Sequence, residues 1–113
     1  MTLIQEFPQG KSFNLTKFLP VQAGAGAAAT IFHRDDLTIY VRSLDAEQTF
    51  GRHQVPAEAI VQVIFGSADI KINDVPNTVK MGEAIVIPAN ATHSVTALEP
   101  AGFYVVVVYP SKS

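Results

Sequence analysis

The stretch GEAIVIPANATH, residues 82–93, contains the pattern from which the fold can be predicted. A short β-rich run, 84–87, is followed by the turn residues Pro88, Ala89 and Asn90, and a second β-rich run starts at His93. Similar runs recur outward from this stretch at intervals of roughly 8 to 12 residues, which is typical of all-β sandwiches and barrels. The sequence therefore predicts an all-β protein.

Nine strands and an N-terminal arm are expected. Residues 1–27 contain prolines and glycines without a helical period, so we expect an extended arm and a connection there. Residues 28–110 are expected to form one barrel domain, because 113 residues suit a single domain. The expected strands are 28–33, 37–44, 49–53, 60–65, 68–72, 77–80, 84–87, 93–98 and 103–109.

Composition excludes several classes of protein. Hydrophobic residues make up 48% of the chain and charged residues 16%, so the chain can bury a core. The 8 basic and 10 acidic side chains give a net charge of −2 without a basic cluster, so no nucleic acid is expected as a partner. The sequence shows no signal peptide and no apolar run of ~20 residues, which predicts a cytoplasmic protein with no membrane partner.

The chain has no cysteine, so the histidines are its candidate nitrogen ligands and neutral-pH bases. They are His33, His53 and His93. His33 ends a strand beside the pair Asp35-Asp36, and we expect a solvent-exposed turn there. A position of His33 at the rim of a pocket is the alternative.

Residues 82–93 resemble the second conserved motif of the cupins. In that motif a glycine is followed after five residues by a proline, and then by a second glycine and a histidine. Gly82, Pro88 and His93 occupy three of these positions. Asn90 replaces the second glycine, and both residue types tolerate the positive φ that such a turn requires.

Residues 52–66 are similar to a degraded copy of the first cupin motif, anchored on Gly66. The aligned positions are His53 for the first histidine, Val55 for the second, Ala59 for the glutamate and Glu47 for the opening glycine. Fifteen residues separate the two motifs, as in the most compact bacterial cupins. The resemblance implies a small RmlC-like cupin of the cupin 2 conserved-barrel type, whose fold is a double-stranded β-helix, or jelly roll.

The resemblance also raises the question of a metal, because the four cupin ligands hold a divalent iron, manganese, zinc or nickel ion. Two of these ligands remain, His53 and His93. Two neutral nitrogens in an apolar interior leave the charge of a divalent cation uncompensated, and stable sites usually have three or four protein ligands. We therefore expect no cofactor, or weak metal binding. Glu58 is expected to face away from the histidines unless a bulge turns it inward.

Strand alternation predicts an apolar pocket that carries the two histidines. Its expected residues are His53, Val55, Ala59, Val61, Val63, His93 and Val95, with Phe65 and Ala97 on the same inner face. Arg42 and Arg52 are expected to face solvent. The alternative is a position at the barrel mouth, where either would attract an anionic ligand.

These features predict a small-molecule-binding protein in which His53 and His93 orient the ligand. The first alternative is a metal-dependent cupin enzyme, a dioxygenase, isomerase or decarboxylase, whose ligands are the two histidines with Glu58, water or substrate. A metal-free variant would use one histidine as a general base. In a third alternative the histidines are hydrogen-bonded core residues of a structural or sensor module with a filled barrel.

Residues 60–65 and 103–109 are apolar at nearly every position, so both faces of these strands require cover. A single core covers the inner face. We expect a second subunit to cover the outer face in a homodimer. The alternative is that residues 1–20 alone cover it.

Overall fold

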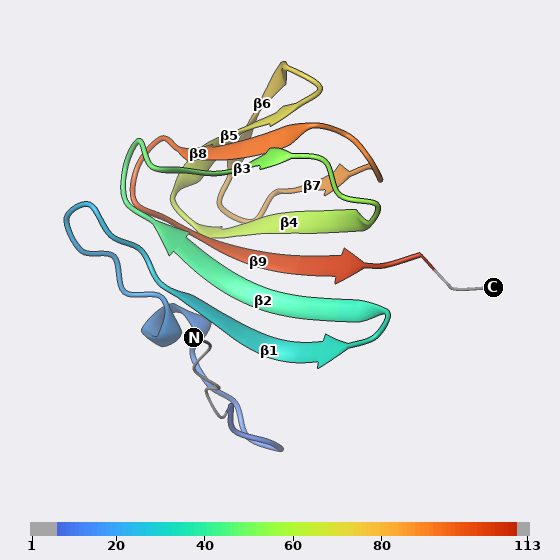
Figure 1. The fold of residues 1–113 in the computed structure, drawn as a ribbon. Helices are drawn as coiled ribbons and strands as arrows, with labels where there is room; N and C mark the ends of the chain where they lie inside the picture. The colour runs from blue at the N-terminus through green and yellow to red at the C-terminus, as the bar shows by residue number, and fades with distance from the viewer. Residues whose placement is uncertain (1–6, 111–113) are drawn as a thin grey trace.

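The fold is a sandwich of two antiparallel sheets (Figure 1). The computed structural model describes residues 7–110, apart from the side chains of Arg52 and His53. The strands of this part of the chain are β1 (Ala28–Arg34), β2 (Leu37–Leu44), β3 (Thr49–His53), β4 (Glu58–Phe65), β5 (Ser67–Ile72), β6 (Val75–Lys80), β7 (Ala84–Ile87), β8 (His93–Ala97) and β9 (Ala101–Val108). The all-β prediction is confirmed, and β2, β3 and β7 have the expected bounds.

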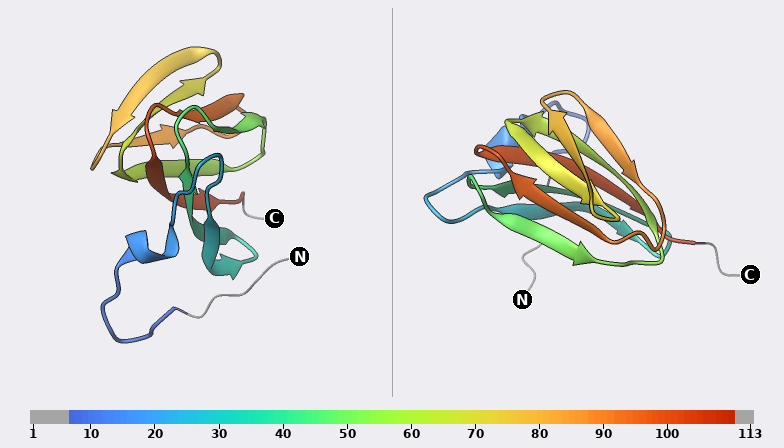
Figure 2. Two further views of the ribbon diagram at one scale, coloured as in Figure 1. Left: turned by 90° about the vertical axis from the view of Figure 1, so that its left-hand side faces the viewer. Right: turned by 90° about the horizontal axis from the view of Figure 1, so that it is seen from above.

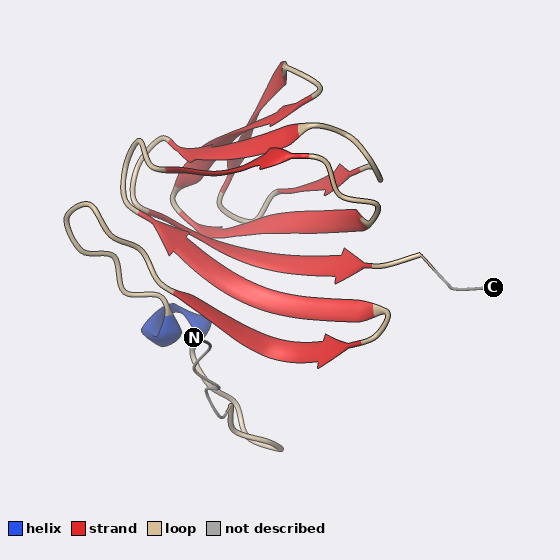
Figure 3. Ribbon diagram, viewed as in Figure 1, coloured by secondary structure: helices blue, strands red, loops and turns tan. Residues whose placement is uncertain are grey.

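The larger sheet has the strand order β1-β2-β9-β4-β7, and the smaller sheet has the order β3-β8-β5-β6. Figure 3 shows these strands as two layers with loops at their ends. The last strand, β9, pairs with both β2 and β4, so segments distant in sequence form the centre of the larger sheet. This topology is the jelly roll that the sequence pattern and the cupin resemblance predict.

The core lies between the two sheets because one face of each strand is apolar. Val61 and Val63 of β4 and Phe103 of β9 are at most 2% exposed. They face Ile70 and Val95 of the smaller sheet, which are equally buried and belong to the same cluster. The period-two pattern of the sequence therefore identifies the inner face of these strands.

Phe65 departs from this alternation. The register between β4 and β9 shifts between Val63 and Phe65, and Phe65 packs with the apolar cluster on the outer face of the larger sheet. A Cβ atom on its partner Gly102 would overlap the Phe65 ring, so the glycine leaves room for that ring. The expectation that Phe65 faces the barrel interior is therefore corrected, and the cause is a β-bulge.

The outer faces of the two sheets differ in polarity. Register pairs place a row of apolar side chains across all five strands of the larger sheet, which we call the outer apolar row. It consists of Phe32, Ile39, Val106, Ile60 and Val86. The corresponding row across the smaller sheet is polar and consists of Thr49, Thr96, Asp69 and Thr78. The smaller sheet thus presents a surface suited to water, and the larger sheet does not.

The N-terminal arm covers part of the outer face of the larger sheet. Leu19, which follows the 3-10 helix η1 (Leu15–Phe18), is 2% exposed and packs against Ala29 and Val41. Figure 2 shows the arm at the β1 end of the sheet. Ile60 and Val86, at the other end, remain 41% and 58% exposed. The described part of the arm, from Phe7 onward, therefore leaves part of this face exposed, and the homodimer stays a prediction.

The described residues contain little helix. No helix among them has the length and apolar character needed to cross a bilayer.

At three glycine positions of the cupin motifs the backbone of this chain has a positive φ. Gly66 has a φ of +77°, and a Cβ atom there would overlap the carbonyl oxygen of Pro100. Asn90 and Glu47, which occupy glycine positions of the motifs, have φ values of 66° and 70°. The backbone thus keeps the left-handed conformation at both positions although the glycine is absent.

We predict that Gly66→Ala destabilises the chain much more than Gly82→Ala. Gly82 also has a positive φ, +85°, but nothing lies within 4 Å of a Cβ atom built there. Gly82→Ala should therefore cost only the left-handed strain, about 1 to 2 kcal/mol. Gly66→Ala adds an overlap with backbone, and its total cost should exceed about 3 kcal/mol. Urea unfolding of both variants measures the difference, and equal losses would contradict the prediction.

For the homodimer, we predict that Ile60→Lys yields a monomer. A charge in the exposed part of the outer apolar row would be buried without a partner if two copies pack through this face. Val75→Lys is the matched control, because Val75 is 60% exposed but lies on β6 of the smaller sheet. Light scattering coupled to size-exclusion chromatography gives the mass of each variant. A wild-type monomer, or a dimer unaffected by Ile60→Lys, would show that this face is not the interface.

Candidate functional site

A cavity of about 320 Å³ lies inside the barrel. Its walls come from both sheets and from the segment between β3 and β4. The lining residues are Tyr40, Arg42, Phe50, Gly51, Val55, Ala57, Ala59, Val61, Ile87, His93, Val95, Val105, Val107 and Tyr109. The barrel is therefore not filled, in contrast to the structural or sensor module considered above.

The structure brings most of the expected pocket residues together. Val55, Ala59, Val61, His93 and Val95 line the cavity. Val63 does not line the cavity; it is fully buried and belongs to the packed core next to it. The side chain of His53 lies outside the described residues, although its backbone pairs with that of His93.

Polar side chains of the cavity come mainly from β2 and from the residue after β9. Of these, the sequence suggested only Arg42, at the barrel mouth, as the alternative to exposure in solvent. Tyr40 and Arg42 of β2 and Tyr109 line the cavity. Their neighbours Ile39 and Val41 are apolar and face the outer side of the sheet. Because the outer face of β2 is apolar, the rule that apolar residues point inward gives the wrong orientation for this strand. The pairing of β2 with β9 is the information that the sequence alone did not supply.

Arg42 is held against an aromatic stack. Its guanidinium carbon lies 4.6 Å from the centroid of the Phe50 ring, in a cation–π arrangement. The Phe50 ring in turn meets Phe103 edge to face, with centroids 5.8 Å apart. Since Phe103 is fully buried, this stack connects the guanidinium to the core. Arg42 thus has the cavity position that was the alternative to exposure in solvent.

Tyr40 and Tyr109 add two phenol groups. Burial raises the pKa of Tyr40, the charge of Arg42 lowers that pKa, and Tyr109 raises it, burial being the largest of these effects. Tyr40 therefore remains a neutral hydrogen-bond donor at ordinary pH. The Tyr109 hydroxyl lies 3.4 Å from the Thr38 hydroxyl, and Thr38 lies 2.9 Å from Nδ1 of His33.

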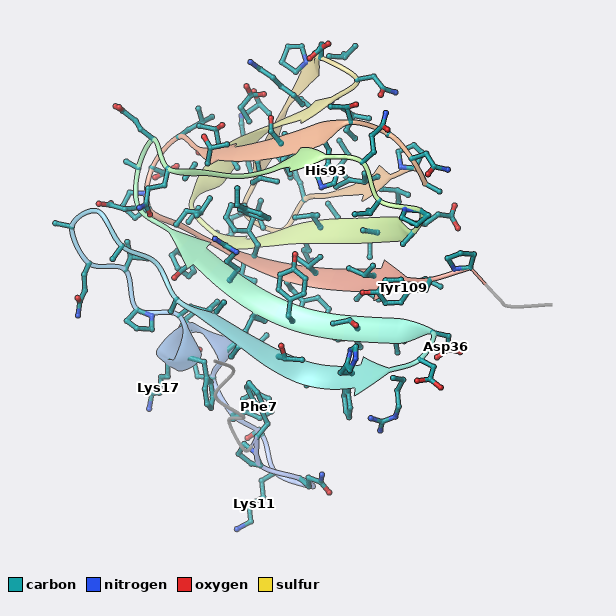
Figure 4. The ribbon with its side chains drawn as sticks, viewed as in Figure 1. Phe7, Lys11, Lys17, Asp36, His93 and Tyr109 are labelled. Carbon is teal, nitrogen blue, oxygen red and sulfur yellow. The ribbon has the colours of Figure 1, made fainter. Side chains whose placement is uncertain are left out.

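His93 occupies the first position of β8, on the smaller sheet (Figure 4). The side chain is half-buried, and Nδ1 lies 3.4 Å from the backbone carbonyl oxygen of Ala91. A Cβ atom on Gly51 would stand 3.3 Å from Cδ2 of the imidazole, so the glycine brings the β3 backbone close to the ring. The ring is thereby fixed at the cavity wall and can orient a polar group of a ligand.

The donor set does not fit the four-ligand metal site of the cupins. Val55 and Ala59, at the positions of a histidine and the glutamate, line the cavity as apolar groups. Glu58 is exposed in β4 and does not line the cavity, as strand alternation predicts. Among the side chains that the structure describes, which exclude His53, no three His, Asp or Glu residues lie together as a metal site.

The remaining candidate residues lie outside the cavity. His33 is an exposed residue of β1, and Asp35 and Asp36 form the exposed turn that follows it. A larger hollow, of about 800 Å³, lies between the arm and the outer face of β1. Its described walls hold no histidine and no carboxylate, and they include the arm residues Phe7 and Phe13. The candidate site is therefore the barrel cavity.

A jelly-roll barrel with an internal cavity and a histidine at the second motif is the class of protein that fold and site define. A conserved protein of unknown function from Streptococcus pyogenes is 34% identical to this chain, with a TM-score of 0.90, and the match covers 99% of this chain and 98% of that protein. A cupin superfamily protein from Desulfitobacterium hafniense is 12% identical, with a TM-score of 0.87, over 96% of this chain and 100% of its own. This chain has the fold of the cupin superfamily.

A third similar structure is a cupin 2 conserved barrel domain protein from Leptotrichia buccalis. It is 26% identical, with a TM-score of 0.75, and the match covers 88% of this chain and 47% of that protein. No protein-family model matches the sequence, and no curated protein matches it.

The raised pKa of Tyr40 leads to a prediction about alkaline pH. The folded chain holds the Tyr40 proton above pH 10.0, where an unperturbed tyrosine loses it. Stability linked to this proton is present below about pH 10 and is lost as the pH rises through the folded pKa. Tyrosinate absorbance should show a late-titrating group, and Tyr40→Phe should remove it. Persistence of the late-titrating group in Tyr40→Phe would contradict the prediction.

Proposed function

We propose that this cupin binds a small, partly apolar organic molecule in its barrel, without a tightly bound metal. The cavity of about 320 Å³ is the observation that carries the proposal. Its volume lies at the lower end of the range of roughly 300 to 1,000 Å³ that is typical of small-molecule sites. Most of its lining is aliphatic, with a few polar groups from Tyr40, Arg42, His93 and Tyr109.

The apolar residues at two former ligand positions support binding rather than metal catalysis. Val55 and Ala59 extend the aliphatic wall where a metal-containing cupin offers nitrogen and oxygen donors. A ligand with a hydrocarbon body gains about 25 cal/mol for each Å² of apolar surface that it buries there. The metal-dependent enzyme would need a further donor, and Glu58 faces away from the cavity.

To test the proposal, we would measure thermal unfolding with a panel of small amphiphiles. The panel contains hexanoate, hexanamide and hexanol, and also phenylacetate, phenylacetamide and phenylethanol. At about 100 times its Kd, a ligand of the folded state adds about 2.7 kcal/mol of stability, which raises the Tm by several degrees. We expect at least one compound to produce such a shift.

The control is a pair of alanine-to-leucine variants. Ala59→Leu places extra volume in the cavity and should abolish the shift, whereas Ala84→Leu, on the exposed face of β7, should leave it unchanged. No shift with any compound, or equal shifts in both variants, would contradict binding in the barrel. One equivalent of transition metal per chain that survives dialysis would contradict the metal-free part of the proposal.

A further inference from the structure

We infer that the ligand is a monocarboxylate with an apolar body, and that Arg42 and Tyr40 bind its carboxylate group. This inference rests on the proposed function and specifies its ligand class. Among the lining residues that the structure describes, which exclude the side chains of Arg52 and His53, Arg42 is the one cationic side chain, and none carries a carboxylate. The described lining thus has an excess of one positive charge.

The stacking of Arg42 leaves its hydrogen-bond donors available. The guanidinium lies over the face of the Phe50 ring, and its five N–H groups point outward in its own plane. A guanidinium fixed in this way presents the planar fork that matches the two oxygens of a carboxylate. The Phe50–Phe103 contact holds the stack in place, so less side-chain entropy is lost on binding.

Tyr40 supplies a donor beside the guanidinium. The two side chains are on the same face of β2, two residues apart, and the Arg42 charge acts on the phenol. Because burial keeps the phenol protonated, its hydroxyl donates to an anion rather than repelling it. Tyr109 lies close enough to Tyr40 to raise the pKa of that phenol. Arg42, Tyr40 and Tyr109 together form the polar corner of the cavity, and Tyr109, which is 36% exposed, lies on its solvent-facing side.

The rest of the cavity selects against a larger or more highly charged anion. Val61, Val105 and Val107 offer no hydrogen bonds, so they suit a hydrocarbon body. A single guanidinium balances one negative charge and would leave the second charge of a phosphate monoester uncompensated. The combination therefore favours a carboxylate that carries an aliphatic or phenyl group.

The test compares acids with neutral molecules of the same body. Titration calorimetry of the full chain would give the Kd of hexanoate against hexanamide, and of phenylacetate against phenylacetamide. We expect at least one acid to bind about tenfold or more tightly than its amide, since a hydrogen bond to a charged group is roughly twice as strong as one to a neutral group and a carboxylate can accept two from a guanidinium. Arg42→Met should weaken that acid about ten- to hundredfold and leave the amide nearly unchanged.

Arg34→Met is the matched control. Arg34 also forms a cation–π contact, 5.4 Å from the centroid of Phe32, but it is exposed on β1 and lies outside the cavity. Acid binding should be the same in Arg34→Met as in the wild type. Thermal unfolding without ligand verifies that both variants fold, and Tyr40→Phe, which keeps the ring, should weaken acid binding severalfold if Arg42→Met does not fold.

The outcomes separate this inference from the proposed function. Equal binding of acids and amides, or acid binding that survives both Arg42→Met and Tyr40→Phe, overturns the carboxylate assignment and leaves small-molecule binding in place. If neither acids nor neutral compounds bind the folded wild-type chain, the proposed function fails, and the inference fails with it.

Discussion

The pairing of β9 with both β2 and β4 is the constraint on which the rest of the structure depends. It places Arg42 opposite Phe103 and Tyr40 opposite Val105, so that a polar stretch of β2 adjoins the most apolar strand of the chain. The same pairing aligns Ile39, Val106 and Ile60 on the opposite face. One set of backbone hydrogen bonds therefore creates both the polar corner of the cavity and the centre of the outer apolar row.

The apolar character of β9 on both faces follows from this central position. Its inner face packs in the core at Phe103 and lines the cavity at Val105 and Val107. Its outer face lies partly under the arm, where Tyr104 packs with the cluster around Leu19. Farther along, Val106 and Val108 extend beyond that cluster, and Val108 is 47% exposed. The smaller sheet has a polar outer face instead, on which the hydroxyl groups of Thr49 and Thr96 form a hydrogen bond. The outer face of the smaller sheet can therefore contact water, whereas that of the larger sheet requires apolar cover, although both sheets share one core.

Much of the fold was predictable, because period-two patterns and turn residues are local signals. They located the strands, and the two cupin motifs identified glycine positions whose left-handed backbone persists at Glu47 in the first motif and Asn90 in the second. The cavity residues of β4 and β8 followed from the same alternation. What could not be predicted was long-range. The inward orientation of Arg42 depends on which face of β2 the arm covers, and the outward orientation of Phe65 depends on a register shift against β9.

The loss of the cupin ligand positions and the inward orientation of Arg42 are connected by charge. A metal-containing barrel carries its positive charge on the ion, which compensates the anionic groups that approach it. In this chain Val55 and Ala59 form part of the wall, and the positive charge of the described cavity is on the guanidinium of Arg42. Arg42 lies outside both cupin motifs and is distant in sequence from the motif histidine His93. A guanidinium differs from a metal ion because it cannot activate water or bind dioxygen. It can still orient a carboxylate, and an orienting charge in an aliphatic cavity is what recognition of an apolar acid requires.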